Sequence, residues 1–260
     1  MLSPYIQSPL LAGKNMLVTG IADEQSIAWG CARAFHDMGA RLAVTYRNEK
    51  DRASVQPLAD SLQALCLPLD VTVDGQMQQV FDTLQREFGV LHSALHSIAF
   101  APKGDLHGPL GGCSRAGFLK AMDCSCYSFI EMARLAAPLM TEGGTLFTMS
   151  YHGAHRVVEN YNVMGPVKAA LEASVRYLAH ELGRQGIRVH TISPGPIRTR
   201  AASGLADFDE LIDAATRRAP AGAVAGIEDV GYATAMLAVD HARLITGSTI
   251  YVDGGAHIMN

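Results

Sequence analysis

Apolar and polar residues follow two patterns that take turns along the chain. Short apolar runs predict β-strands, and longer stretches with apolar residues at helical spacing predict α-helices. The predicted strands are residues 15–20, 41–46, 64–69, 91–98, 145–150, 187–193 and 248–252. The predicted helices are residues 27–38, 51–63, 76–88, 114–140, 161–184, 207–217 and 227–239. Strands that alternate with crossover helices form a parallel sheet with helices on both faces. The pattern therefore predicts a doubly wound, three-layer α/β/α fold.

A single domain accounts for the whole chain, residues 1–260. The sequence contains no internal repeat, low-complexity tract or long linker, and α/β folds of this length occur as one unit. The one long stretch without periodicity, residues 194–206, is rich in proline and glycine. Because ligands bind beyond the carboxyl ends of the strands in an open α/β sheet, we expect residues 194–217 to form a substrate loop or lid.

Composition and charge narrow the class of protein. Hydrophobic residues make up 48% of the chain and charged residues 18%, which is ordinary globular usage. A net charge of -4 and a pI near 6.2 argue against nucleic-acid binding. The chain has no basic start and no apolar run of about 18 residues, so we expect no membrane span. The five cysteines and ten histidines lack metal-binding spacing. We therefore expect a cytoplasmic protein with free thiols and no metal.

The turn after the first predicted strand is a candidate phosphate site. Gly20 ends the strand, and the helix that follows offers backbone N–H groups and the positive end of its dipole. The later glycines of the usual dinucleotide fingerprint are missing, so a plain turn remains an alternative. Asp23 and Glu24 suit a helix start but would repel a phosphate.

Two further positions could bind the rest of a nucleotide. Arg47 follows the second strand, where it could pair with a ribose 2′-phosphate or serve as a solvated surface residue. Asp70 and Val71 follow the third strand, and the Asp70 side chain could hold an adenine or cap a turn.

Tyr151, Tyr161 and Lys168 are the candidate catalytic residues. If residues 161–168 are helical, their spacing places Tyr161 and Lys168 on one helix face. The ammonium group would then lower the pKa of the phenol and bind a ribose hydroxyl, and the tyrosine could donate a proton to a reacting carbonyl or enolate. His152 and His155 flank Tyr151 and are interpreted as surface or hydrogen-bonded histidines.

Taken together, these motifs resemble the divergent short-chain dehydrogenase/reductases, and within them the enoyl-acyl-carrier-protein reductases of bacterial fatty-acid synthesis. The resemblance runs from Leu11 to about Ile258. The matching blocks are residues 20–28, 70–71, 96–102, 150–151, 160–165, 168–169, 195–199, 201–204, 227–231 and 252–255. Other members of the superfamily place the lysine four residues after the tyrosine, whereas here Gly165 occupies that position. This spacing disfavours simple carbonyl reduction.

The resemblance implies a Rossmann-type fold and hydride transfer from NADH or NADPH to the β-carbon of a trans-2-enoyl thioester. Tyr161 would stabilise the enolate oxygen, Lys168 would hold the nicotinamide ribose, and Tyr151 would line the acyl pocket. The cofactor-binding residues implied are Gly20, Ser26, Ile27, Arg47, Asp70, Val71, Ser97, Ile98, Ala99, Lys168, Ile197 and Thr199. The substrate-binding residues implied are Phe100, Ala101, Tyr151, Tyr161 and Ala201.

The resemblance also implies an acyl-carrier-protein substrate and a homotetramer that packs through helices 114–140 and 161–184. Pro166 would kink a helix that began well before it but suits a first turn. Arg47 leaves the choice between NADH and NADPH open.

The segment 205–211 is acidic where several relatives carry basic residues, and it would repel an acidic carrier. Docking would then use another patch, for which the candidates are Arg198, Arg200, Arg217 and Arg218. The alternatives are a different thioester carrier, a reductase of another enone or carbonyl, and a nucleotide-binding protein without catalysis.

Overall fold

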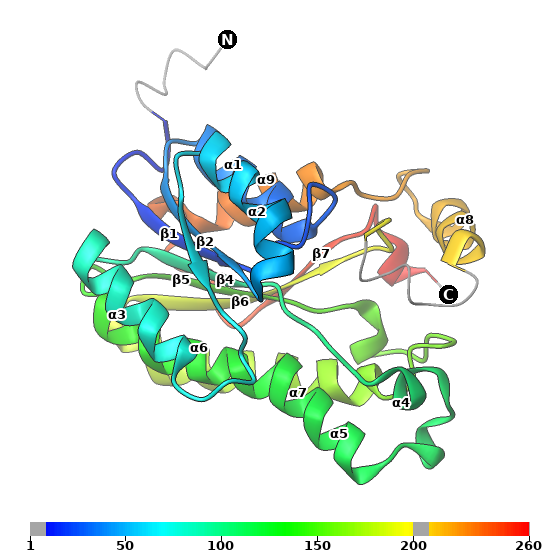
Figure 1. Ribbon diagram of the computed structural model, residues 1–260. Helices are drawn as coiled ribbons and strands as arrows, with labels where there is room; N and C mark the ends of the chain where they lie inside the picture. Colours follow the sequence, from blue (N-terminus) through cyan, green and yellow to red (C-terminus); the bar gives the residue numbers. More distant parts are fainter. Residues whose placement is uncertain (1–8, 200–207, 260) are drawn as a thin grey trace.

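Seven parallel strands form the centre of the molecule in the computed structural model, which describes residues 9–199 and 208–259 (Figure 1). The strands are β1 (Asn15–Thr19), β2 (Arg41–Tyr46), β3 (Leu65–Pro68), β4 (Ser93–His96), β5 (Gly144–Met149), β6 (Ile187–Pro194) and β7 (Thr249–Val252). Their order across the sheet is β3-β2-β1-β4-β5-β6-β7. Each strand lies where the apolar pattern predicts it, and the doubly wound parallel sheet is confirmed.

Helices cover both faces of this sheet (Figure 1). One face carries α1 (Ile27–Asp37), α2 (Glu49–Ser61) and α9 (Ile227–Ala238). The other carries α3 (Gln76–Phe88), α6 (Ser128–Ala136) and α7 (Met164–Leu182). Three further helices are α4 (Lys103–His107), α5 (Arg115–Met122) and α8 (Phe208–Arg218), of which α4 and α8 lie beyond the carboxyl ends of the strands. The three-layer arrangement is therefore confirmed as well. No helix in the described ranges is long and apolar enough to span a membrane.

The core consists of two apolar layers, one on each face of the sheet. Phe81 and Phe129 are fully buried on the α3 face, and Phe35 and Phe147 are fully buried on the α1 face. Burying one such side chain contributes about 1.5–3 kcal/mol. The five inner strands are mostly buried, whereas the edge strands β3 and β7 are partly exposed. Burial on both sides explains why the inner strands appear in the sequence as nearly continuous apolar runs.

The order of the strands creates a crevice at the carboxyl ends of β1 and β4. These two strands are neighbours, but the chain winds from β1 toward β3 and from β4 toward β7 in opposite directions. Ligands of doubly wound sheets bind where the winding direction changes. Gly20 follows β1 and Ser97 follows β4, so both lie at this point.

The predicted helix 114–140 is confirmed as a continuous helical segment, but its geometry changes along its length. After α5 the chain makes a π-helical turn at Asp123–Tyr127, continues as α6, and ends in a 3-10 turn. A side chain of this π-helical turn is hydrogen-bonded to a distant part of the chain. The Ser125 hydroxyl accepts from the Phe100 N–H at 2.9 Å and donates to the Phe100 carbonyl at 3.1 Å. Such contacts with a distant segment are invisible to helical periodicity.

The predicted helix 161–184 also begins later than its pattern indicates. Helix α7 begins at Met164, so Tyr161 lies in the turn before it. Asn160 and Asn162 have φ values of 61° and 39°, and asparagine tolerates this left-handed region better than most residues. Pro166 is the third residue of the helix, where a backbone N–H would have no partner within the helix. Pro166 therefore causes no kink.

Candidate active site

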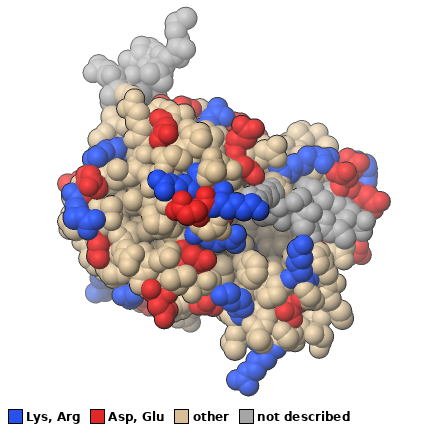
Figure 2. Space-filling model, viewed as in Figure 1, with Lys and Arg blue, Asp and Glu red and all other residues tan. Residues whose placement is uncertain are grey.

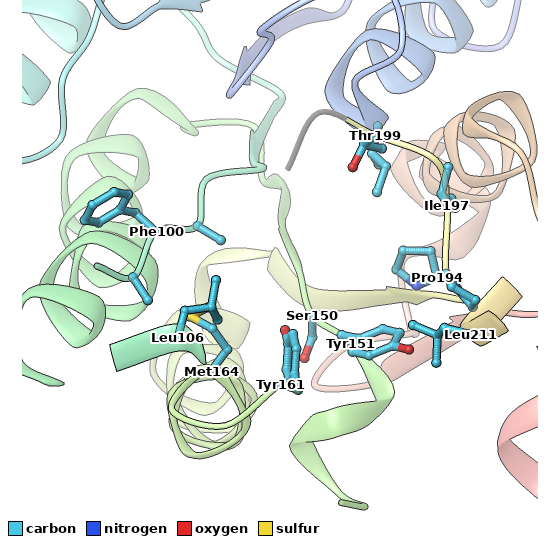
Figure 3. A pocket seen from close by; sticks show the side chains of 15 residues that line it. Phe100, Leu106, Ser150, Tyr151, Tyr161, Met164, Pro194, Ile197, Thr199 and Leu211 are labelled. Atoms are coloured by element: carbon cyan, nitrogen blue, oxygen red, sulfur yellow. The ribbon is translucent and has the colours of Figure 1, made fainter. Parts of the chain in front are cut away.

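A cavity of about 220 Å³ lies beyond the carboxyl ends of β4, β5 and β6 (Figure 3). Its predicted lining residues are Ile27, Ala99, Phe100, Ala101, Tyr151, Tyr161, Ile197 and Thr199. Four more lining residues lie in the predicted substrate loop or lid, namely Pro194, Gly195, Pro196 and Leu211, and three were not among the predicted site residues, namely Leu106, Ser150 and Met164. The walls are mainly apolar, and the two tyrosines supply hydroxyl groups. Such a cavity suits an acyl chain that carries a polar reacting end.

The two tyrosines pack against each other at one side of the cavity. The ring centroids of Tyr151 and Tyr161 are 5.0 Å apart at an interplanar angle of 65°, an edge-to-face contact. Figure 3 shows the Tyr161 hydroxyl pointing into the cavity and the Tyr151 hydroxyl pointing toward Leu211 of α8. The structure thus brings together two residues that lie ten positions apart in the sequence.

Local structure holds the Tyr161 ring on both sides. The Asn162 amide Nδ2 donates to the Leu106 carbonyl at 2.7 Å, which ties the Tyr161 turn to the α4 wall of the cavity. On the other side the ring lies directly against Gly153. A Cβ atom at Gly153 would lie 2.5 Å from Tyr161 Cδ1, which is far inside contact distance. Glycine at position 153 therefore makes room for the ring.

The expected lowering of the Tyr161 pKa is wrong. Burial raises the pKa of Tyr161 well above its usual value, and the neighbouring Tyr151 and Glu172 raise it further. Burial also raises the pKa of Tyr151, although the positive charge of Arg218 opposes this rise. Both phenols consequently remain protonated at neutral pH. Tyr161 can act as a neutral hydrogen-bond donor, the form that stabilises a developing oxyanion.

Lys168 is buried beneath the end of β5. Its Nζ donates to the Met149 carbonyl at 2.7 Å, two residues before Tyr151. Burial lowers the pKa of Lys168 to about 8, against the opposing effects of Cys126, Cys124 and Glu172. The interpretation that Tyr161 and Lys168 share one helix face is wrong, because only Lys168 lies in α7. Their relative placement depends on the turn before the helix instead.

The turn after β1 lies where the winding direction of the sheet changes, which is where a dinucleotide would bind. Gly20 has a φ of 91°, and a Cβ there would lie 2.0 Å from the Ser97 carbonyl oxygen and 3.4 Å from Ile98. The missing side chain is what allows the two strand ends to approach and leaves their backbone accessible. Helix α1 begins at Ile27, soon after this turn, and the first N–H groups of a helix have no partner within the helix and can bind a phosphate. The Ser26 hydroxyl accepts from the backbone N–H groups of Ala22 and Asp23, each at 3.0 Å, and thereby shapes the turn.

The predicted adenine end of the nucleotide site contains Asp70 and Arg47. Asp70 Oδ1 accepts from the Thr72 N–H at 2.9 Å and the Thr72 hydroxyl at 2.7 Å. Burial by itself raises the Asp70 pKa, but these hydrogen bonds and the charges of Arg47 and Lys120 lower it below its ordinary value. Arg47 Nε lies 3.4 Å from Asp51, and most of its side chain is exposed. Two cations therefore lie near Asp70, of which the sequence had identified only Arg47.

The remaining predicted positions have different surroundings. Val71 packs against the core on the α3 face and is only partly exposed. Arg198 forms an ion pair with Asp209 in the first turn of α8. Ala201 and Arg200 lie outside the described residues. Among the residues that are described, no group of three or more His, Cys, Asp and Glu side chains could hold a metal ion.

A signal for some of the missed lining residues was present in the sequence. Pro194, Gly195 and Pro196 begin the long aperiodic stretch after a strand, which is where a ligand loop is expected. Leu211 lies within the predicted lid 194–217, and Ser150 and Met164 lie in blocks that match the family. Leu106 carries no such signal, because it is an apolar residue of a short helix that only the tertiary structure brings to the cavity.

The fold and the site define a nucleotide-binding α/β oxidoreductase of the short-chain dehydrogenase/reductase type. A family model described as enoyl-(acyl carrier protein) reductase matches residues 20–257. The chain therefore belongs to the enoyl-acyl-carrier-protein reductase family, as its motifs predict.

Individual relatives agree over nearly their full length. The chain is 47% identical over 253 residues to enoyl-acyl-carrier-protein reductase (NADH) FabI of Bacillus cereus, covering 96% of this chain and 99% of that protein. It is 45% identical to FabI of Bacillus subtilis, covering 95% and 97%. The structure of the Bacillus cereus enoyl-acyl carrier protein reductase with NADP+ and indole naphthyridinone superimposes with a TM-score of 0.95, covering 96% and 99% of the two chains. The Aquifex aeolicus enzyme superimposes with a TM-score of 0.93 at 43% identity, covering 96% and 99%.

Proposed function

We propose that the chain reduces the carbon–carbon double bond of a trans-2-enoyl thioester carried by acyl carrier protein, as a step of fatty-acid biosynthesis. One observation carries the proposal: the Tyr161 hydroxyl points into a mainly apolar cavity that Ile27 of α1 also lines, and burial raises its pKa. The acyl chain would lie against Phe100, Leu106 and Met164. The described parts of the predicted lid, residues 194–199 and 208–217, would border it, since Pro196, Ile197 and Leu211 line the cavity. Residues 200–207 of the predicted lid lie outside the described residues.

The roles of the chain's own residues follow from their positions. A bound reduced nicotinamide supplies the hydride that adds to the β-carbon. Negative charge then develops on the thioester oxygen, and the Tyr161 hydroxyl donates a hydrogen bond to it. Tyr151 packs on the edge of the Tyr161 ring and limits its movement. Lys168, whose Nζ donates a hydrogen bond to the Met149 carbonyl, places a positive charge where the nicotinamide ribose would bind. A proton added at the α-carbon completes the saturated thioester.

For the cofactor, the proposal is a reduced nicotinamide dinucleotide whose 2′ position lies near Arg47. The Asp51 carboxylate lies 3.4 Å from Arg47 Nε and would compete with a 2′-phosphate for the guanidinium. Lys120 adds a second positive charge near Asp70. These cations favour acceptance of a 2′-phosphate, and hence of NADPH beside NADH. The Arg47→Gln variant should lose NADPH-dependent turnover by about tenfold and retain NADH-dependent turnover within twofold. Equal losses with both cofactors would contradict this role of Arg47.

Carrier docking needs local positive charge near the cavity mouth. Figure 2 shows acidic and basic side chains interspersed over one face of the molecule. The acidic residues Asp209 and Glu210 lie in the first turn of α8, where they complement the helix dipole, and Arg198 pairs with Asp209. Arg217 and Arg218 lie in the last turn of α8, and the charge of Arg218 acts on Tyr151. We propose this pair as the carrier contact.

The Arg217→Ala/Arg218→Ala double variant tests that contact. It should raise the KM for a carrier-bound enoyl substrate several-fold, because acidic carriers are attracted by such charges. The KM for the corresponding N-acetylcysteamine thioester, which carries no protein, should stay the same. A matched rise with both substrates would assign the two arginines to the pocket instead.

The assembly and the location are also part of the proposal. Exposed apolar side chains on α5, the π-helical turn and α7 would pack between subunits of a homotetramer: Phe118, Leu119, Tyr127 and Tyr177. Burying large exposed apolar side chains between subunits is favourable. A monomer in sedimentation would refute the tetramer. We propose a cytoplasmic location, which the relationship to enzymes of bacterial fatty-acid synthesis supports.

The first experiment is cofactor oxidation by the purified protein with a trans-2-enoyl thioester, presented on acyl carrier protein and on coenzyme A, with NADH and with NADPH. Turnover of the carrier conjugate supports the proposal. The Tyr161→Phe variant should lower kcat at least a hundredfold and leave nicotinamide affinity within twofold, because only the oxyanion contact is lost. Turnover of ketones but of no enoyl thioester would favour a carbonyl reductase instead.

A further inference from the structure

A buried carboxylate lies directly beneath the segment that carries Tyr151. The Glu172 side chain is 1% exposed and lies on α7, one helical turn beyond Lys168. Its Oε1 accepts from the Ser150 hydroxyl at 2.6 Å, and its Oε2 accepts from the Thr249 hydroxyl at 3.2 Å. His155 Nε2 donates to the same Oε2, since a carboxylate only accepts. Both carboxylate oxygens of Glu172 therefore have partners.

Two of these partners are the two ends of one short segment. Ser150 directly precedes Tyr151, and His155 follows the 3-10 turn His152–Ala154. Between them lies Gly153, against which the Tyr161 ring packs. Both tyrosines thus rest on a loop whose beginning and end are bonded to a single carboxylate. The third partner, Thr249, lies at the start of β7 and connects the carboxylate to the edge of the sheet.

The charge of Glu172 also acts on the site. It raises the pKa of Lys168, against the larger lowering by burial, and it adds to the raised pKa of Tyr161. Both effects favour the forms that the reaction uses, an ammonium group and a protonated phenol. A buried carboxylate is costly unless it is fully hydrogen-bonded, and this one is held by groups from the segment 150–155 and from β7.

We propose that Glu172 is a positioning residue for the reduction, with His155 and Ser150 as its partners. Together they hold the segment 150–155 so that Tyr151 and, through Gly153, Tyr161 present their rings at the geometry the oxyanion requires. A displacement of about 1 Å in a reacting group can lower the rate by about a hundredfold. The inference deepens the proposed function and rests on it.

The test uses Glu172→Gln, which keeps the shape of the side chain but removes its charge, together with His155→Ala and Ser150→Ala. In each variant kcat should fall at least fivefold. The dissociation constant of the nicotinamide cofactor, measured well below pH 8 so that Lys168 stays charged, should remain within twofold of the wild type. Hydrogen–deuterium exchange should accelerate in the peptide that covers residues 150–163. Glu142→Gln is the matched control, because it removes the charge from another Glu–His contact, with His92 at 3.4 Å, at the opposite end of β5. Its turnover should equal that of the wild type.

A lower melting temperature with unchanged kcat and unchanged exchange would reduce Glu172 to a structural role and overturn the proposal. If Glu172→Gln does not fold, His155→Ala decides in the same assays, since the His155 side chain is 51% exposed and its loss leaves no cavity in the core. Failure of the proposed function is a separate result. In that case the wild type itself reduces no enoyl thioester, and the exchange measurement still accepts or rejects the positioning of residues 150–155.

Discussion

Substituting Gly153 by alanine tests how closely the Tyr161 ring must be placed. The φ of Gly153 is not in the left-handed region, so the backbone accepts alanine without strain. The obstacle is the new Cβ, which would lie 2.5 Å from Cδ1 and 2.9 Å from Cε1 of the Tyr161 ring. An ordinary contact begins near 3.4 Å, so the ring or the loop must move by about 1 Å. We therefore expect kcat to fall by about a hundredfold, which corresponds to about 2.7 kcal/mol in the barrier.

The assay measures kcat, the KM for the enoyl thioester and the melting temperature of Gly153→Ala beside a glycine control. Overpacking of this kind costs about 1–3 kcal/mol of stability, so the variant should still fold. Gly183→Ala is the control, because its φ is -60° and no atom lies within 4 Å of the added Cβ. It should keep wild-type turnover. Wild-type kcat in Gly153→Ala would refute the claim that this contact sets the position of Tyr161.

Three further predictions concern Lys168, Pro166 and Gly20. Since burial lowers the pKa of Lys168 to about 8, its charge is present below that pH and lost above it. Nicotinamide affinity should therefore weaken as the pH rises through about 8, whereas Lys168→Arg should flatten this dependence in a binding titration. The first turn of α7 forms without a proline, so Pro166→Ala should leave kcat within twofold of the wild type. A large loss of kcat would show that the proline ring shapes the site. Gly20→Ala would put a Cβ 2.0 Å from the Ser97 carbonyl oxygen at a φ of 91°. The protein should therefore fail to fold, or calorimetry should detect no cofactor binding. Normal binding would contradict the close approach of Gly20 and Ser97.

Much of the fold could be predicted because it depends on local pattern. Helices cover both faces of the sheet, so its strands consist of short apolar runs. Such runs can be recognised in the sequence without knowing which segments pack against them. Gly20 follows β1 and has a positive φ that few other residues adopt, so the turn at this position could also be predicted from the sequence. Helix α3 matches its predicted bounds of 76–88, since its apolar positions recur at regular helical spacing.

The active site was only partly predictable, because its geometry depends on contacts between distant segments. The sequence identified Tyr151, Tyr161 and Lys168 but placed Tyr161 on a helix and expected a lowered pKa. Helical spacing alone does not reveal that two left-handed asparagines hold Tyr161 before the helix, or that burial dominates its electrostatics.

The sequence by itself determined the alternation of strands and helices, the parallel sheet and the residue types at the site. Only the tertiary structure decided how these residues meet. Glu172 shows the difference: in the sequence it is one acidic residue of a helix, and in the structure Ser150, His155 and Thr249 surround its carboxylate. The physical reason is that apolar periodicity is a property of each segment, whereas desolvation and hydrogen bonding arise only when separate segments pack together.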